Sequence, residues 1–321
     1  MRPVLRLLTI VAGLSGFAYG QQTSEVHVLH VQGNVYMLVG AVGNITVQVS
    51  NDGVLLVDTG VAQMSDQVLA AVRQLAKPLT QRPIRYILNT HVHADHTGGN
   101  EKLRAAGATI TGGNVAGNIA DATEGAAIFA HENVMKRMSA PTGAQAPTPT
   151  GAWPTDTYYG DQKELFFNGE AIQMFHPKSA HTDGDSIVFF RRSDVVSTGD
   201  IFMTTSYPII DLQNGGSLNG IIDALNFILD ITIPAEKQEG GTMVIPGHGR
   251  LCDEADVVEY RDMVTIIRDR VQDMIKKGMT LEQVKAAKPT RDYDPLYGAT
   301  TGFWTTDMFV EAAYKSLTAK K

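Results

Sequence analysis

Three histidines and one aspartate lie within six consecutive positions, His91 to His96, in a chain of 321 residues that contains nine histidines. They follow the apolar segment 84–88 (IRYIL), which predicts a buried β-strand. Zinc in proteins binds neutral imidazole nitrogen and carboxylate oxygen, and a catalytic site keeps one position open for water. The segment 89–100 (NTHVHADHTGGN) is therefore a candidate metal-binding loop, provided that other parts of the chain supply the remaining ligands.

The spacing within this segment favours two metals. Alternate residues of an extended loop share a face, so we expect His91 and His93 to point the same way. Asp95 and His96 come just after, where the chain turns into a helix that begins near Gly98. One short segment can therefore present two pairs of ligands toward two neighbouring metals.

Three further residues of ligand type occupy matching positions elsewhere. His181, Asp200 and His248 each come at the carboxyl end of a predicted strand, beside a turn that contains glycine. Loops at one edge of a sheet converge to form sites. The shared placement predicts that these residues complete a metal centre with the segment 89–100.

The remaining pattern predicts an α/β protein. A meander at 35–58, with a turn signal at 51–53, precedes a helix near 64–76 and the strand 84–88. A second set follows, with strands at 169–177, 185–200 and 242–249, a helix at 219–229 and a mainly helical carboxyl-terminal part. We expect two half-sheets with helices outside, in one domain over residues 21–321.

These motifs, in this order, resemble the metallo-β-lactamase superfamily of hydrolases. The resemblance rests on Asp58 in VDTG, the HVHADH element, and the ordered residues His181, Asp200 and His248. It implies an αββα four-layer sandwich, which agrees with the two half-sheets expected from the sequence pattern.

The resemblance also implies a role for each motif residue. His91, His93 and His181 would bind a first zinc, and Asp95, His96 and His248 a second, with Asp200 bridging both. Asp58 would lie behind the ligands and steady the metal-binding loop, as partners of ligand histidines commonly do. We therefore expect two Zn²⁺ ions per chain.

The chemistry expected of such a centre is metal-assisted hydrolysis. A metal-bound hydroxide would attack an electrophilic centre, with Asp95 orienting the nucleophile and accepting its proton. The resemblance favours a small carbonyl substrate, namely a lactone, ester or thioester, because the named β-lactamases typically carry cysteine or serine where this chain has Asp200. A β-lactamase is the alternative reading. A di-iron redox protein is an alternative from another class, since His and Asp ligands also suit iron.

Composition and the amino terminus limit the partners. The net charge of −7 argues against a nucleic-acid partner, which would favour a basic surface. Residues 1–20 combine Arg2 and Arg6, a short apolar stretch and a small-residue cleavage pattern, which predict a signal peptide rather than a stable membrane span. We therefore expect an exported protein, periplasmic or extracellular, that begins near Gln21 and acts on a small molecule.

Residues 115–160 are rich in Pro, Gly, Ala and Thr, which predicts a long surface loop. Its aromatic residues Trp153, Tyr158 and Tyr159 are candidates for contacts with the substrate. An alternative is that this loop packs on its own domain.

The chain's single cysteine and its other histidines receive a structural interpretation. Cys252 is expected to be a small buried hydrophobe. His27 and His30 alternate with apolar residues, as on an exposed strand, and His131 is expected to start a helix. His176 precedes a proline and is expected to be structural.

Overall fold

The computed structural model describes residues 25–77, 83–109, 125–140 and 148–319. The predicted signal peptide, residues 1–20, lies outside the described residues. Among the described residues, no helix is both long enough and apolar enough to cross a membrane.

The first half of the chain forms a seven-stranded sheet in the order β1 to β7. Strands β1 to β4 pair antiparallel, as the predicted meander requires, and β4 to β7 pair parallel. The strands are β1 His27–Gln32, β2 Val35–Val39, β3 Ile45–Ser50, β4 Gly53–Val57, β5 Ile84–Leu88, β6 Ala127–His131 and β7 Asp156–Tyr158.

The second half forms a five-stranded sheet in the order β12-β11-β10-β9-β8. Neighbouring strands from β8 to β11 are antiparallel, whereas β11 and β12 are parallel. The strands are β8 Gln162–Phe167, β9 Glu170–Phe175, β10 Ile187–Phe190, β11 Val195–Ser197 and β12 Met243–Ile245.

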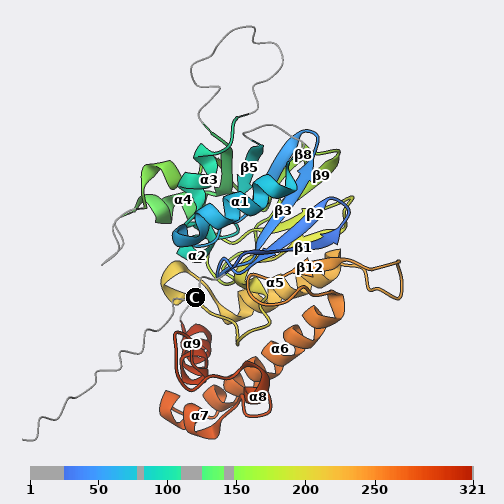
Figure 1. The fold of residues 1–321 in the computed structure, drawn as a ribbon. Helices are drawn as coiled ribbons and strands as arrows, with labels where there is room; N and C mark the ends of the chain where they lie inside the picture. Colours follow the sequence, from blue (N-terminus) through green and yellow to red (C-terminus); the bar gives the residue numbers. More distant parts are fainter. Residues whose placement is uncertain (1–24, 78–82, 110–124, 141–147, 320–321) are drawn as a thin grey trace, which may run out of the picture.

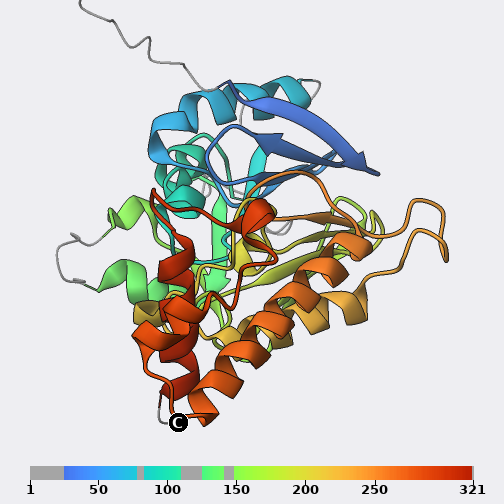
Figure 2. The same cartoon turned by 90° about the horizontal axis from the view of Figure 1, so that it is seen from below.

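Helices cover the outer face of each sheet, and the two sheets pack against each other (Figures 1 and 2). Helices α1 (Ser65–Leu75) and α3 (Asn100–Ala105) bury apolar side chains against the first sheet. Helices α5 (Leu218–Ile231), α6 (Glu254–Lys276) and α9 (Thr306–Thr318) do the same against the second. A third apolar cluster fills the space between the sheets with side chains from both. These are the four layers of the predicted αββα sandwich.

The other α-helices of the described residues are α2 Ala94–Thr97, α4 Glu132–Ser139, α7 Leu281–Ala287 and α8 Asp294–Tyr297. Helix α7 begins with the capping box of Thr280 and Gln283 that its sequence pattern indicates.

The prediction of one long loop over residues 115–160 is wrong in part. Residues 127–131 form β6, which pairs in parallel with β5, and helix α4 follows it directly. Tyr158 ends strand β7, and its side chain is 4% exposed. The Pro- and Gly-rich composition is concentrated after Ser139, and the apolar segment AIFA within the region supplies a strand that this average composition concealed.

The strand directions explain where a site can form. Strands β4 and β5 are parallel, so Asp58 and the segment 89–96 emerge at one edge of the first sheet. Strands β9 and β11 both run antiparallel to β10, and β12 is parallel to β11, so the segments after all three emerge at one edge of the second sheet. His181, Asp200 and His248 lie in those segments.

Candidate metal centre

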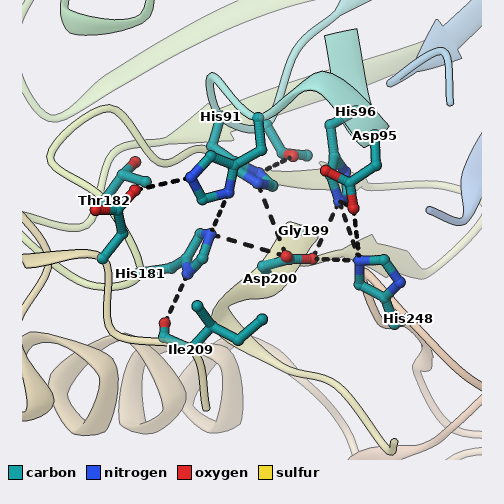
Figure 3. A network of polar contacts seen from close by, with 12 residues as sticks. His91, Asp95, His96, His181, Thr182, Gly199, Asp200, Ile209 and His248 are labelled. Carbon is teal, nitrogen blue, oxygen red and sulfur yellow. Dashed lines mark hydrogen bonds and ion pairs between the residues drawn. The ribbon is translucent and has the colours of Figure 1, made fainter. Parts of the chain in front are cut away.

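The predicted ligands meet in two groups that share Asp200 (Figure 3). Within each group, the ligand atoms all lie within 4.8 Å of one another. The first ligand group is His91, His93, His181 and Asp200. The second ligand group is Asp95, His96, Asp200 and His248.

In the first ligand group, three imidazole rings surround one carboxylate oxygen. Nε2 of His181 lies 3.0 Å from Nδ1 of His93. Oδ2 of Asp200 lies 3.8 Å from Nε2 of His91 and 3.8 Å from Nε2 of His181. The nitrogen and oxygen atoms thus converge on one point between the rings.

In the second ligand group, the other oxygen of Asp200 faces two more rings. Oδ1 of Asp200 lies 3.1 Å from Nε2 of His96 and 3.4 Å from Nε2 of His248. Oδ2 of Asp95 lies 3.2 Å from the same nitrogen of His248. Because the two oxygens of Asp200 face different groups, this carboxylate is placed to bridge two metals.

Unpaired buried atoms show that these residues suit a metal. Nε2 of His91 and Oδ1 of Asp200 are buried, and neither has a hydrogen-bond partner among the described residues. The 3.1 Å approach of His96 to Asp200 Oδ1 is an ion-pair contact without hydrogen-bond geometry. Buried polar atoms without partners are costly and call for an explanation. A cation between nitrogen and carboxylate donors satisfies them, and zinc accepts this donor set.

Asp58 lies behind the segment 89–96 and fixes it by hydrogen bonds. Oδ1 of Asp58 accepts a hydrogen bond of 2.8 Å from the backbone N–H of Thr90, and Oδ2 one of 2.6 Å from its hydroxyl. Oδ2 also lies 2.8 Å from Nδ1 of His96, so it orients that ring with Nε2 toward Asp200. Asp58 has φ +64°, a left-handed conformation that aspartate tolerates better than most residues.

Glycines let the backbone approach the ligands closely. A Cβ at Gly247 would collide with Oδ1 of Asp200. A Cβ at Gly43 would lie 2.7 Å from the carbonyl oxygen of Asp95. Asn44, next to Gly43, donates from Nδ2 to the carbonyl of Pro246 at 2.9 Å, which ties the β2–β3 turn to the loop that carries His248.

The sequence reasoning missed the segment 209–214, which supports two ligands of the first group. The carbonyl oxygen of Ile209 lies 2.7 Å from Nδ1 of His181. Oδ2 of Asp211 lies 2.8 Å from Nε2 of His93, and the backbone N–H of Asp211 donates to the carbonyl of His181. An aspartate that follows two isoleucines without a strand pattern gave no signal of this role.

Burial and mutual charge set the protonation of the centre. Burial lowers the pKa of His181 to about 4 and holds the pKa of His91 well below its ordinary value, so both rings are neutral, as metal ligands must be. Burial opposes charge on Asp200, but the protonated rings of His96 and His248 outweigh it and hold the pKa of Asp200 well below its ordinary range. The carboxylate is therefore ionised at neutral pH. The same contacts raise the pKa of His96 and bring that of His248 to about 9, so metal binding to these two rings must release protons.

One side of the centre faces solvent. The side chains of Asp95, His93 and His248 are 28%, 29% and 20% exposed, whereas His96 is fully buried. A substrate can therefore approach past Asp95 and His248.

The three aromatic candidates of residues 115–160 belong to neither ligand group. Trp153 packs in a small apolar cluster with Val92, and its Nε1 donates to the carbonyl of Thr148 at 2.7 Å. The Tyr158 hydroxyl lies 2.7 Å from the Ser186 hydroxyl in the core. Tyr159 is 70% exposed, and its contact with substrate stays a prediction.

The positions of Cys252 and of the histidines outside the two ligand groups agree with a structural role. His131 caps helix α4 by accepting from the backbone N–H of Asn133, and His176 stacks on His131 at 3.6 Å between ring centroids. His30 lies on the exposed strand β1. Cys252 is buried, and its thiol lies 3.3 Å from the carbonyl oxygen of Arg250 and belongs to neither ligand group.

Residues 38–248 match the family model described as the metallo-beta-lactamase superfamily. This match covers more than half of the chain, and the chain therefore belongs to that superfamily. Its two groups of His and Asp residues could hold metal ions, as members of a hydrolase superfamily require.

Individual relatives are distant. The chain is 24% identical over 277 residues to a linear primary-alkylsulfatase of Pseudomonas sp. (strain ATCC 19151), a match that covers 76% of this chain and 50% of the relative. The solved structure of the stereoselective inverting sec-alkylsulfatase Pisa1 from Pseudomonas sp. has a TM-score of 0.62 at 15% identity, covering 90% of this chain and 50% of that one. The chain thus spans about half the length of these relatives.

Metallo-β-lactamases share the fold over most of their own length. The metallo-beta-lactamase from Pontibacter korlensis has a TM-score of 0.53 at 16% identity, covering 75% of this chain and 99% of that chain. DIM-1 metallo-beta-lactamase has a TM-score of 0.52 at 17% identity, covering 75% of this chain and 97% of that chain. At these identities the likeness concerns the fold.

Proposed function

We propose that this protein is a zinc hydrolase with two metals per chain that acts on a small carbonyl substrate, namely a lactone, ester or thioester. The observation that supports the two metals best is the position of Asp200, whose two carboxylate oxygens face different ligand groups. Bound zinc would supply Lewis-acid chemistry, lowering the pKa of water to about 7 and stabilising negative charge on the substrate oxygen.

Asp95 is the residue of the centre best placed to handle a proton. Its carboxylate is partly exposed, and Oδ2 lies 3.2 Å from Nε2 of His248. Burial raises its pKa, but the hydrogen bond with His248 and the charge of His96 outweigh burial and lower it, so the carboxylate is ionised at neutral pH. An ionised carboxylate at the open side can orient a water molecule and accept its proton.

A cavity near His248 supports a partly apolar substrate. It has a volume of about 480 Å³, and its lining combines the apolar residues Phe202, Leu296 and Tyr297 with the charged residues Arg250, Asp256 and Glu259. The backbone N–H of Thr204, another lining residue, donates to the carbonyl of His248 at 3.1 Å, so one wall is continuous with the second ligand group. Leu296 is 75% exposed, so its side chain is available to contact an alkyl group of the substrate.

Sulfate esters are the second candidate substrate class, because the curated relative is an alkylsulfatase. An alkyl sulfate also combines an anionic, hydrolysable head with an apolar tail. β-Lactams are a third class to test, since two metallo-β-lactamases share the fold.

A substrate panel tests the proposal. The zinc-loaded wild type is assayed with a lactone, a carboxylic ester, a thioester, a β-lactam and an alkyl sulfate, beside an Asp95→Asn variant. We expect carbonyl substrates to turn over, and we expect the variant to have a kcat at least about 10²-fold lower than the wild type. Turnover of the alkyl sulfate alone would contradict the carbonyl assignment and favour the second candidate. Bound iron with visible absorbance and no hydrolysis would favour a di-iron redox protein.

A matched pair of variants tests the cavity. Leu296→Ala should raise KM for substrates with an alkyl chain more than for short ones and change kcat little. Ile266→Ala is the control, because Ile266 is a 39% exposed apolar residue of α6 that does not line the cavity. Equal KM values in both variants would contradict the cavity assignment.

We also propose that the protein is exported, from the pattern of residues 1–20. The amino-terminal sequence of protein recovered from its own cell should begin at or next to Gln21. Recovery of cytosolic protein that retains MRPVLRLL would contradict export and leave the metal chemistry unaffected.

A further inference from the structure

A continuous series of polar contacts connects helix α4 with His93. Asp211 contacts Nε2 of His93, the ring edge opposite the nitrogen that faces His181. Nδ2 of Asn214 donates to the same oxygen of Asp211 at 2.5 Å, and Nη1 of Arg137 donates to Oδ1 of Asn214 at 2.9 Å. Arg137 lies on α4, outside both ligand groups.

Asp211 is held rigidly by these contacts. Its Oδ1 accepts hydrogen bonds of 3.0 Å from the backbone N–H groups of Gln213 and Asn214, and its Oδ2 receives Asn214 and His93. Because both oxygens form hydrogen bonds, the orientation of the Asp211 carboxylate toward His93 is fixed. The His93 ring is thereby held with Nδ1 toward His181.

Arg137 is anchored equally firmly. Its Nε and Nη2 donate to the two carboxylate oxygens of Asp183, at 2.8 Å and 2.5 Å, in the bidentate geometry that a planar guanidinium favours. The backbone N–H of Asp183 donates to the carbonyl of Asn214 at 2.8 Å. The guanidinium therefore joins the turn after His181 to the turn that carries Asp211.

We propose that Asp211 is a positioning residue for His93 and that Arg137, acting through Asn214, sets the metal affinity of the first ligand group. This inference rests on the proposed metal binding and adds a determinant outside both ligand groups. Carboxylates behind ligand histidines fix the ring and raise its basicity, and losing such partners typically lowers metal affinity about 10–100-fold. Among the described residues, the polar contacts of this series reach His93 and not the second ligand group, in which Asp58 orients His96.

The experiment measures metal affinity without substrate. Apo-protein is titrated with Co²⁺ and with Zn²⁺ against a competing chelator, and the visible bands of bound cobalt report each metal equivalent. The variants are Arg137→Met and the nearly isosteric Asp211→Asn, which covers the case that the first variant fails to fold.

Arg261→Met supplies the matched control. Arg261 also contacts an aspartate and an asparagine, with Nε at 2.7 Å from Asp262 and Nη1 at 2.6 Å from Asn226, but on helix α6 and outside the centre. Its side chain is 28% exposed, close to the 25% of Arg137. A purely structural effect of losing a partly buried arginine should appear in both variants.

We expect Arg137→Met and Asp211→Asn to weaken one metal equivalent about 10-fold or more, to change its cobalt bands, and to leave the other within about twofold of the wild type. Arg261→Met should leave both unchanged. Unchanged affinities in the first two variants, or equal weakening of both equivalents, would overturn the inference. A wild type that binds two metals but hydrolyses nothing would refute only the proposed function, whereas a wild type that binds no metal would refute both.

Discussion

Oδ2 of Asp58 lies 2.8 Å from Nδ1 of His96, and both side chains are almost completely buried. The same carboxylate receives the N–H and the hydroxyl of Thr90, so it fixes the loop and the ring together. Asp58→Asn keeps a side chain that tolerates the positive φ but removes the charge. We expect the second ligand group to lose about 10-fold or more in metal affinity, measured by chelator competition. An unchanged affinity would show that Asp58 does not support the metal site.

Gly247→Ala tests the close approach of backbone to Asp200. The added methyl group would collide with Oδ1 of Asp200 and must displace either the carboxylate or the loop that carries His248. We expect a folded apo-protein with reduced metal content, measured by elemental analysis beside circular dichroism. Full metal content in the variant would mean that the Asp200 carboxylate can move and still bind both metals. That result would contradict its assigned position between the two ligand groups.

The lowered pKa of His131 predicts that the folded protein becomes less stable at acidic pH. Burial, together with the stacked ring of His176, lowers the pKa of His131 to about 4, below the ordinary value of 6.5. Between these two values the unfolded chain binds more protons than the folded one, so stability falls as the pH decreases from about 6.5 to about 4.

The variant His131→Asn keeps an acceptor for the cap of α4 and removes the titrating ring. Between pH 7.5 and pH 5, the wild type should lose about 1–2 kcal/mol more unfolding free energy than this variant, as measured by denaturant titration of the apo-protein. Parallel losses in the two proteins would show that His131 does not contribute to the acid sensitivity.

Cys252 should be dispensable for metal binding. Burial raises the pKa of its thiol to about 12, so the thiolate that zinc prefers does not form at neutral pH. Cys252→Ala should therefore retain the wild-type metal stoichiometry. Loss of one zinc equivalent from this variant would assign a ligand role to the thiol.

Much of the fold and the centre could be predicted from the sequence, because the signals were local. The alternation at 35–58 and the turn at 51–53 gave the meander β2 to β4. The ligand residues were recognisable because each follows a strand, and strand direction brings such ends together. The structure places all seven predicted ligands in two groups that share one aspartate.

What the sequence left undetermined depends on contacts between distant segments. The contact between Asp211 and His93 joins residues 118 positions apart, and no spacing rule indicates it. Strand β6 lies in a region whose average composition indicates a loop, and its pairing with β5 decides its conformation. Substrate preference likewise depends on cavity walls from separate segments, such as Phe202 and Leu296.

The metal content of the purified protein tests the central claim most directly. Elemental analysis of the wild type and of Asp200→Ala, each loaded with zinc and freed of excess metal, should find about two zinc ions per wild-type chain and fewer in the variant. The rate of hydrolysis of a generic ester or lactone should fall with the metal content. A wild type with one zinc, or an Asp200→Ala variant that retains both metals and full activity, would contradict the bridged two-metal centre.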